Sequence, residues 1–292
     1  MIKRLVAKFM FRAMTIWDAL RTFRGSSATL WVPQEGLASP PFPIADGPDV
    51  VAFSATDSIT TSVVSATTFQ LAVRAKSPSS FWELNDTNGI NAYDQTGGGN
   101  TGTLVGGVTA NASGPFPGST AMTFAAATSG QITTTASVSN PTTVTVMAAF
   151  STTGSAGPLV GLINPQTGSA TNYDRNLWID GTALAFSVYN GGTVTVTSSA
   201  TVNDGTWHLA IGTIGVSGMT LFLDGVSVAT NANTSAQNYT GWWRMGGNAD
   251  GAGGNQFYTG KEAYVATWDA SEITAADVSD LWAAWQASLS GG

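Results

Sequence analysis

Apolar residues near the start of the chain recur with the period of a helix. Over residues 2–24 they return at steps of three and four and form one stripe, while basic and polar residues follow another face. Gly25 and the two serines after it form a stop signal. We therefore predict an amphipathic anchor helix over residues 1–27, with assembly contacts through Leu5, Phe9, Ile16 and Leu20.

Three roles fit this helix. It can attach the chain to a particle or form a short oligomerising coil, which is our working hypothesis. A basic amphipathic helix can also lie on a membrane surface. The third role is a helix that packs against its own domain.

Residues 28–77 change pattern twice. Five prolines between residues 28 and 48 fix φ and predict an extended arm. Apolar and polar residues then alternate, and we interpret this part, including the run 69–73, as a few strands of a small β connector. The connector is too short for a core of its own, so it needs a partner chain or the next domain.

From residue 78 onward, short runs of β-branched and aromatic residues are separated by turn signals. Asp180-Gly181, Asn190-Gly191-Gly192 and Asp224-Gly225 each lie between two such runs. Asx-Gly pairs favour tight hairpins, because these turns need positive φ. Repeated hairpins without intervening helices predict an antiparallel sandwich or barrel over residues 78–292.

One helix is predicted near the end of this region. Thr274 can cap it, with Asp277 three residues further on. Apolar residues follow at helical spacing, so we expect the helix to fold back over an edge or a face of the sandwich. Those residues are Val278, Leu281, Trp282 and Trp285.

Composition limits the chemistry. The chain has no cysteine, which excludes disulfides and thiolate metal sites. Its one histidine, His208, excludes a site with several histidine ligands. An oxygen-ligand site for Ca²⁺ remains open, because such sites need only carboxylates, amides and carbonyls.

Charge is distributed unevenly. Six of the eleven basic residues lie in the first 24 positions, where Asp18 is the only acid, so this segment carries +5. The remaining 268 residues carry 5 basic and 17 acidic side chains, or −12, so we expect no nucleic-acid binding by the main domain. No stretch is long and apolar enough for a transmembrane span. Lys8 and Arg12 interrupt the stretch that would have to be the uncharged apolar core of a signal peptide. Release by cell lysis, as part of a virus particle, is one alternative to secretion.

Several motifs occur in a fixed order between about residues 80 and 286. Gly205-Thr206-Trp207-His208-Leu209-Ala210 is close to a W-H-H-V-A pattern, and Leu221-Phe222-Leu223-Asp224-Gly225 is close to L-x-V-D-G. Further matching segments are Phe81–Asp86, Ala92–Leu104, Gly118–Phe124, Tyr258–Ala266 and Ile273–Val278. Together they resemble the laminin-G-like, or concanavalin A-like, jelly-roll family. At Lys261-Glu262-Ala263 the chain departs from the acid pair usual in that family.

The resemblance implies a mainly β fold: an antiparallel, concanavalin A-like jelly-roll sandwich with a C-terminal helix. The amphipathic helix and the small β connector would precede it. The residues of the motifs have structural interpretations as well. Trp207 and Leu209 are expected in the core, Asp224-Gly225 in a turn, and Asp94 as a turn-capping carboxylate.

We expect no enzymatic activity. Glycoside hydrolases on related folds need two carboxylates that flank the sugar, and a Glu-x-Asp-x-x-Glu run is missing here. The chain also lacks a G-x-S-x-G elbow, a P-loop and an H-E-x-x-H motif. His208 lies beside Trp207 in a segment that resembles a core strand of the family, so we interpret it as a structural residue.

Two stretches have the chemistry of a carbohydrate site, which combines an aromatic platform with amide and carboxylate partners. Adjacent tryptophans at 242 and 243 point to opposite faces of a strand, so one is core and the other is exposed. The predicted ligand-binding residues are Trp243, Arg244, Asn248, Asp250, Tyr173 and Asp174. Asp174, Asn248 and Asp250 are also the predicted ligands of a Ca²⁺ ion.

The arrangement as a whole resembles tail or capsid-surface proteins of tailed bacteriophages. The leading hypothesis is a virion structural protein on the particle surface. Residues 1–77 would bind other virion proteins, and the lectin-like domain would bind host-surface carbohydrate. A homo-oligomer is expected, because unpaired strand edges in the connector invite neighbours.

Three alternatives remain. The protein can be a bacterial cell-surface or extracellular carbohydrate-binding module, which requires export. It can be a purely architectural decoration protein without a ligand, which flat polar faces would favour. It can also be a glycosidase or lyase.

Overall fold

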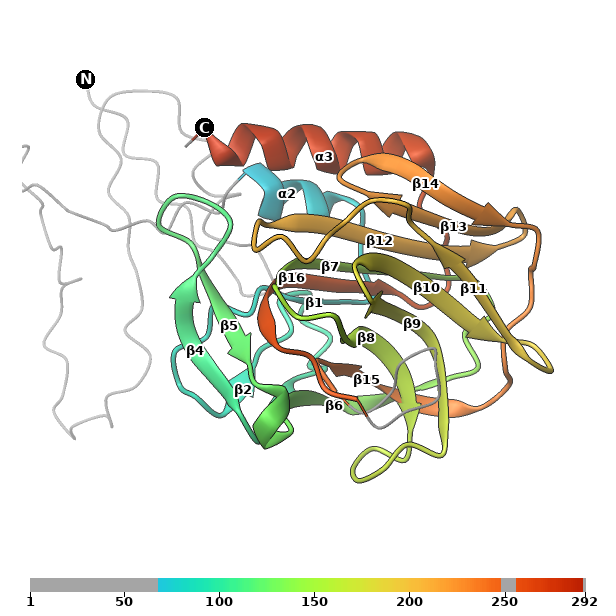
Figure 1. Cartoon of the computed structure of the whole chain (residues 1–292), viewed down its shortest axis with the longest axis horizontal. Coiled ribbons are helices and arrows are strands. Elements are labelled where there is room, and N and C mark those ends of the chain that lie inside the picture. Colours follow the sequence, from blue (N-terminus) through green and yellow to red (C-terminus); the bar gives the residue numbers. More distant parts are fainter. Residues whose placement is uncertain (1–67, 248–255, 291–292) are drawn as a thin grey trace, which may run out of the picture. The chain divides into compact units, whose positions relative to one another are not determined.

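The computed structural model describes residues 68–247 and 256–290. In this part, two antiparallel β-sheets face each other and two helices pack against one of them (Figure 1). The predicted β-sandwich with a C-terminal helix is therefore confirmed. The predicted anchor helix, the proline arm and the connector up to residue 67 lie outside the described residues.

The sheet next to the helices is called sheet A. Seven of its strands follow one path, and the eighth pairs with β16 beside it. In spatial order the path is β14 (Val226–Asn231), β13 (Gly218–Leu223), β12 (His208–Gly215), β7 (Val144–Ser151), β16 (Gly260–Trp268), β5 (Thr120–Phe124) and β4 (Val108–Ser113), with β1 (Ser80–Trp82) off it.

The other sheet is called sheet B. Two of the predicted Asx-Gly turns join its strands β9, β10 and β11, and the third joins β13 to β14 in sheet A. A short 3₁₀ helix, η1 (Ala126–Thr128), follows β5. In spatial order sheet B is β11 (Thr193–Thr197), β10 (Ala183–Tyr189), β9 (Asn172–Asp180), β8 (Ala156–Asn164), β15 (Thr240–Met245), β6 (Gln131–Ser139), β3 (Gly102–Val105) and β2 (Asn91–Ala92).

Sheet A is buried on both faces, which explains why its central strands are apolar at nearly every position. On β7, Val146 and Ala148 point into the core between the sheets, whereas Met147 and Ala149 point toward the helices. The core between the sheets contains large side chains from both: Trp82, Phe124, Phe150, Phe186, Trp243 and Tyr258.

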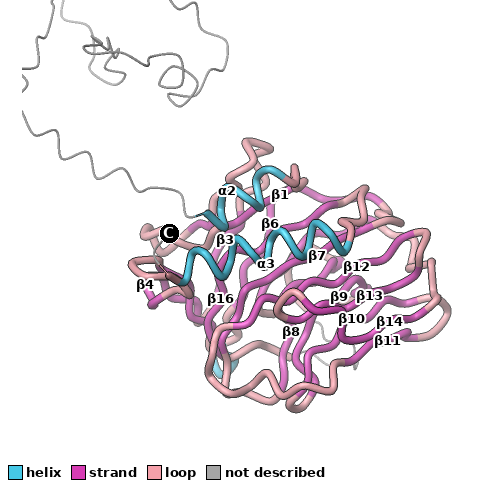
Figure 2. Tube along the Cα trace, turned by 90° about the horizontal axis from the view of Figure 1, so that it is seen from above, coloured by secondary structure: helices cyan, strands magenta, loops and turns pink. Residues whose placement is uncertain are grey.

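The helices cover the outer face of sheet A (Figure 2). Helix α3 (Ala275–Leu289) begins with the predicted capping box, in which Thr274 Oγ1 accepts from the N–H of Asp277 and the Asp277 carboxylate accepts from the N–H of Thr274. Trp285 of α3 packs edge-on against Phe69 of α2 (Thr68–Ala75), with ring centroids 5.2 Å apart.

Helix α2 corrects one prediction: the strand expected over residues 69–73 is wrong. Phe69 and Val73 are fully buried, but Leu71 between them is 57% exposed. Burial at i and i+4 without i+2 is the helical pattern, whereas a half-buried strand would bury all three. The apolar alternation fits both periods over so short a run, and contact with α3 decides between them.

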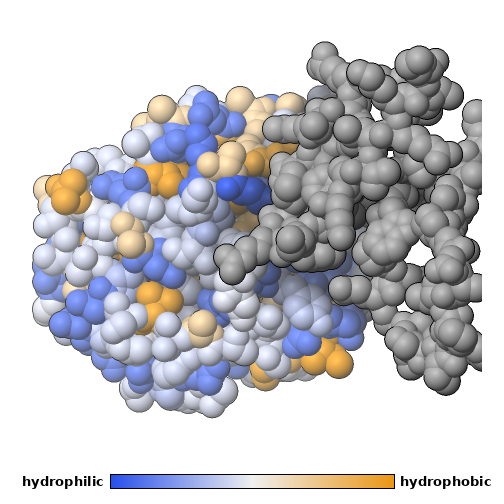
Figure 3. Space-filling model, turned by 180° about the vertical axis from the view of Figure 1, so that it is seen from behind, coloured by the Kyte–Doolittle hydropathy of each residue, from blue (hydrophilic) through white to orange (hydrophobic). Residues whose placement is uncertain are grey.

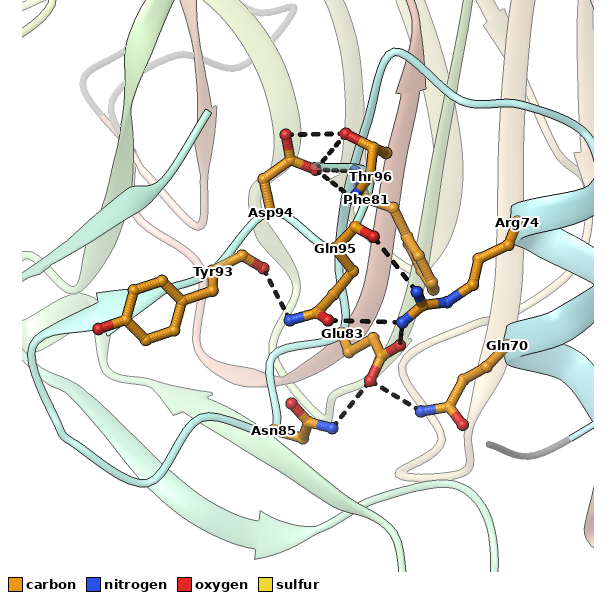
Figure 4. A network of polar contacts seen from close by, with 9 residues as sticks. All are labelled: Gln70, Arg74, Phe81, Glu83, Asn85, Tyr93, Asp94, Gln95 and Thr96. Atoms are coloured by element: carbon orange, nitrogen blue, oxygen red, sulfur yellow. Dashed lines mark hydrogen bonds and ion pairs between the residues drawn. The ribbon is translucent and has the colours of Figure 1, made fainter. Parts of the chain in front are cut away.

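Polar contacts fasten α2 to the start of the sandwich (Figure 4). The buried Glu83 carboxylate accepts from Gln70 Nε2 at 2.9 Å and from Arg74 Nη2 at 2.7 Å. Asp94 accepts from the backbone N–H groups of Phe81 and Thr96, which confirms that it caps a turn.

Candidate functional site

The outer face of sheet B differs from that of sheet A, because none of the described helices covers it. Leu177 and Ile179 of β9 and Phe186 of β10 belong to the core between the sheets. Side chains alternate along a strand, so the residues between them point outward. On β9, β10 and β11 these outward residues are Asn176, Trp178, Ser187, Tyr189, Thr193 and Thr195.

Several of these residues line a shallow depression at one end of the face. Cross-strand pairing places Asn176 opposite Ser187 and Tyr189 opposite Thr193. Tyr189 is 41% exposed, whereas Asn176 and Ser187 lie at the buried floor. The lining consists of Tyr173, Asp174, Asn176, Ser187, Val188, Tyr189 and Thr193.

On β9, two buried polar atoms of this face have no hydrogen-bond partner within the described part of the chain. They are the carbonyl oxygen Oδ1 of Asn176 and the indole Nε1 of Trp178. Gly161 of β8 leaves the space that the Asn176 amide occupies, since a Cβ there would collide with it. Buried polar groups are nearly always paired, so one unmet acceptor and one unmet donor on the same strand indicate a place for a polar ligand.

A buried ion pair lies at the base of the depression. Asp174 Oδ2 accepts from Arg175 Nη1 at 3.1 Å and from the N–H of Gln237 at 2.7 Å. Asp174 Oδ1 accepts from the N–H groups of Arg175 and Tyr189. Burial raises the pKa of Asp174, an effect opposed by Arg175 and by these N–H donors. The pair therefore fixes the ends of β9 and β10 on which Tyr173 and Tyr189 lie.

The predicted ligand residues divide into three groups. Tyr173 does line the depression. Trp243 was predicted as an exposed platform, and this is wrong: it is fully buried in the core between the sheets, and its Nε1 donates to Asp269. Trp242 is the partly exposed member of the pair. Asn248 and Asp250 lie outside the described residues.

Arg244 was also predicted to bind a ligand, but its guanidinium is already engaged. It is 1% exposed and donates to the carbonyl oxygens of Pro165, Gln166 and Gly168, in the segment between β8 and β9. Burial lowers its pKa to about 10, so the group remains charged at neutral pH. Its role in this structure is to hold that segment over sheet B.

Of the three residues proposed as Ca²⁺ ligands, Asp174 is the one that lies among the described residues. Both oxygens of Asp174 accept from protein donors, so the side chain is committed to the fold. The described residues contain no group of three acidic or histidine side chains that could hold a metal ion. Because Asn248 and Asp250 lie outside the described residues, the Ca²⁺ site stays a prediction.

His208 has contacts that fit the expected structural role. Its Nδ1 lies 2.8 Å from Asp224 Oδ2, and its Nε2 lies 3.2 Å from Thr206 Oγ1 and 3.3 Å from Asp204 Oδ1. These contacts tie the segment before β12 to the turn between β13 and β14. Its hydrogen bond to Asp224 raises the pKa of His208, and Asp204 adds to this while burial opposes it.

The exposed apolar side chains are spread over the described surface. On the face drawn in Figure 3, hydrophobic residues form small patches separated by hydrophilic and neutral ones. Such scattered residues are ordinary on a protein surface and do not mark a docking site. Those with the largest exposure are Leu71, Ile90, Tyr93, Val105, Tyr189, Val216, Val226 and Leu289. None of the described helices has the length and apolarity to cross a bilayer.

Sequence reasoning missed Asn176, Ser187, Tyr189 and Thr193. A signal for them was present in the strict alternation of Thr193-Val194-Thr195-Val196-Thr197, which follows a tight turn. It shows that the threonines face away from a core. Because β11 pairs with β10 in register, the residues opposite the threonines share their face.

Comparison with known proteins agrees with this fold. A sequence profile described as the concanavalin A-like lectin/glucanases superfamily matches residues 124–279. No curated protein matches the chain in sequence.

Solved structures share the fold at low identity. The binding domain of botulinum neurotoxin DC, in complex with rat synaptotagmin II, has a TM-score of 0.52 and 13% identity, over 72% of this chain and 52% of that one. Trypanosoma rangeli sialidase, in complex with sialic acid, has a TM-score of 0.51 and 12% identity, over 70% of this chain and 32% of that one. The chain thus spans about half the length of the toxin domain and a third of the sialidase.

Proposed function

Because the chain belongs to the concanavalin A-like lectin/glucanases superfamily, we propose that the outer face of sheet B binds carbohydrate. One observation carries the proposal: Asn176 Oδ1 and Trp178 Nε1 are buried on this face without partners among the described residues. Both atoms are covered in this structure, so neighbouring side chains must move before a sugar hydroxyl can donate to the first or accept from the second. Tyr173 and Tyr189 line the depression together with Asn176 and offer aromatic surface of the kind on which sugar rings stack.

The neighbours in structure allow more than one class of ligand, since one is solved with a sugar and another with a protein. The depression favours the sugar. It is shallow, and the side chains that line it carry hydroxyl, amide and phenol groups that can exchange hydrogen bonds with sugar hydroxyls.

We also propose that binding is not followed by cleavage. Glycoside hydrolysis needs two carboxylates that flank the bond. Among the described residues that line the depression, Asp174 is the only acid, and both its oxygens accept from protein donors. Incubation with bound polysaccharide should release no reducing sugar, and release that Asp174→Asn abolishes would contradict this part of the proposal.

A glycan array of bacterial envelope polysaccharides tests the binding proposal. Tyr189→Ala should lower affinity about tenfold, because it removes an exposed ring from the depression. Tyr93→Ala is the matched control: Tyr93 is 46% exposed, adjoins β2 at the opposite edge of sheet B, and its removal should leave affinity unchanged. Equal effects of the two variants, or an array without any bound glycan, would reject the proposal.

For the biological setting, we propose a bacteriophage virion structural protein on the particle surface, either in the tail or on the capsid. Residues 1–77 would attach it to other virion proteins, and the sandwich would face host glycans. The basic amphipathic pattern of residues 2–24 and the proline arm support this arrangement. Deletion of residues 1–27 should abolish incorporation into particles, measured by immunoblot of purified virions, and normal incorporation would contradict the anchor role.

A further inference from the structure

We infer that the carbohydrate bound at the outer face of sheet B is a neutral one, without carboxylate, phosphate or sulfate groups. The inference rests on the proposed function and adds a substrate class to it. An arginine or lysine in a site stabilises the anionic group of an acidic sugar, because it compensates for the hydration that the charge loses. The described residues offer no such cation on this face.

The described part of the chain contains five basic side chains, and each can be located. Arg74 and Lys76 belong to α2 and the turn after it, which pack on sheet A at the far side of the sandwich. Arg74 pairs with Glu83, and Lys76 pairs with Asp277 and Asp280 of α3. Neither lies near the depression, since the only contact of Arg74 with the sheet B strands' connections among the described residues is with Gln95, between β2 and β3 at the opposite edge.

Arg175 lies close to the depression but is committed to the fold. Its side chain is fully buried and donates to Asp174, to the carbonyl of Pro141 and to the carbonyl of Gln237. Its guanidinium also lies over the ring of Tyr239. A ligand anion would have to break these contacts to reach it.

The other two basic residues are equally unsuited. Arg244 points to the outer face of sheet B, but it is 1% exposed beneath the segment whose three carbonyls it binds. Lys261 is on β16 of sheet A, opposite Thr123 of β5 and Ser151 of β7. No cation of the described residues is therefore available to a ligand in the depression.

The surrounding charge acts in the same direction. The described residues carry twelve acidic side chains against these five basic ones. A domain with this imbalance repels anionic ligands over about a Debye length, close to 10 Å at 0.1 M salt. The groups that line the depression, an amide, hydroxyls and phenols, match the donors and acceptors of neutral sugars, and the indole N–H of Trp178 lies further along β9.

The test compares neutral glycans with acidic counterparts built on the same sugar backbone, with the full chain as the protein. Suitable pairs are lactose and 3′-sialyllactose, methyl-esterified and free oligogalacturonate, and cellohexaose and its carboxymethylated form. The basic residues near the start of the chain can also attract anions, so only binding that Tyr189→Ala removes is assigned to this face. The neutral member of each bound pair should bind about tenfold or more tightly, and the preference should shrink as salt rises.

A charge variant sharpens the test. Thr195 is exposed on β11 opposite Ser187, so Thr195→Arg adds a free cation beside the depression. Thr230→Arg adds the same charge to an exposed position of β14 in sheet A and is the matched control. Thr195→Arg should lower the ratio of the affinity for the neutral glycan to that for the acidic glycan about threefold or more. Thr230→Arg should leave this ratio unchanged.

The outcomes separate the inference from the function on which it rests. Equal or tighter binding of the acidic members, still removed by Tyr189→Ala, would overturn the inference and leave carbohydrate binding in place. The inference also fails, with carbohydrate binding intact, if Thr195→Arg and Thr230→Arg shift the preference equally. If Tyr189→Ala affects no glycan in the panel, the proposed function fails and the inference fails with it.

Discussion

Glu262 is a charged residue type placed in the apolar core between the two sheets. It is fully buried, and neither carboxylate oxygen has a hydrogen-bond partner among the described residues. Burial raises the pKa of Glu262 well above its ordinary value, because the charged form would lose its hydration in the core. Strict alternation along β16 would place Glu262 on the outer face of sheet A. Its pairing with β5 and β7 places it on the inner face, toward sheet B.

The raised pKa of Glu262 predicts a loss of stability with rising pH. Below the unfolded pKa near 4.5 the group is protonated in both states and costs nothing. Above it, the unfolded state releases the proton first, and the free energy of unfolding falls by about 1.4 kcal/mol per pH unit until the folded pKa is reached. Glu262→Gln should remove this slope in urea titrations over the pH range from 4.5 upward. A difference from wild type that stays constant over that range would contradict the prediction.

His208 titrates in the same structure with a different cause. Its raised pKa means that the bond to Asp224 stabilises the fold fully below the unfolded pKa of 6.5 and less as pH rises through the folded pKa. Asp224→Asn should therefore cost about 1–3 kcal/mol at pH 5.5 and less at pH 9, measured by chemical unfolding. His208 is the sole histidine, so its imidazole signal in a proton NMR titration reports the pKa directly. An unshifted midpoint would refute this account.

At the level of single residues, the sequence predicted which kinds of side chain matter better than it predicted which of them are exposed. It predicted that one of the adjacent tryptophans 242 and 243 is core, but it assigned the exposed role to the wrong one. A period of two has no preferred face, so only the packing of Trp243 against the opposite sheet decides the matter. Arg244 follows the same rule, since it lies on the face opposite Trp243 and is then covered by residues 165–168.

Between elements, the pair of helices is the feature that most changes the domain boundary. Phe69 and Val73 of α2 are buried in the cluster that α3 and sheet A also form, and Trp268 Nε1 donates to the carbonyl of Lys76. Helix α2 is thus part of the sandwich domain, although its residues fall within the segment 28–77 assigned to the arm and connector. Contact with a helix about two hundred residues away carries no local signal in the sequence.

The boundary can be measured with two fragments. Residues 68–292 should fold with a higher melting temperature than residues 78–292. Removal of α2 takes away two fully buried apolar side chains, worth together about 3–6 kcal/mol. Equal stability of the fragments would show that α2 contributes nothing.

Substitutions within the longer fragment supply a matched control for the truncation. Phe69→Ala should cost about 3–5 kcal/mol, because it empties the space between Phe116, Tyr264 and Trp285. Leu71→Ala, at a position 57% exposed, should cost little. Costs of similar size at the two positions would contradict the account that packing of Phe69 is what stabilises α2, because alanine does not lower helix propensity.

For the whole molecule, oligomerisation stays a prediction, because the residues that would drive it lie outside the described part. The apolar stripe through Leu5, Phe9, Ile16 and Leu20 predicts that the full chain forms a homo-oligomer. Light scattering should find residues 68–292 monomeric and the full chain assembled, with Leu5→Ser and Phe9→Ser together dissociating it. Assembly of the short fragment to the same size would move the interface to the sandwich.

The sequence alone determined the class of the fold and much of its connectivity. Alternating apolar residues, Asx-Gly turns and the capping box of α3 act over a few neighbours, so they can be recognised without a structure. The candidate site depended on tertiary structure. Tyr173 was recognised, but Asn176, Ser187, Tyr189 and Thr193 come together through cross-strand register. Alternation marks the two faces of a strand but does not say which one meets solvent. In the tertiary structure both helices dock on sheet A, and the outer face of sheet B is therefore the one that they leave open.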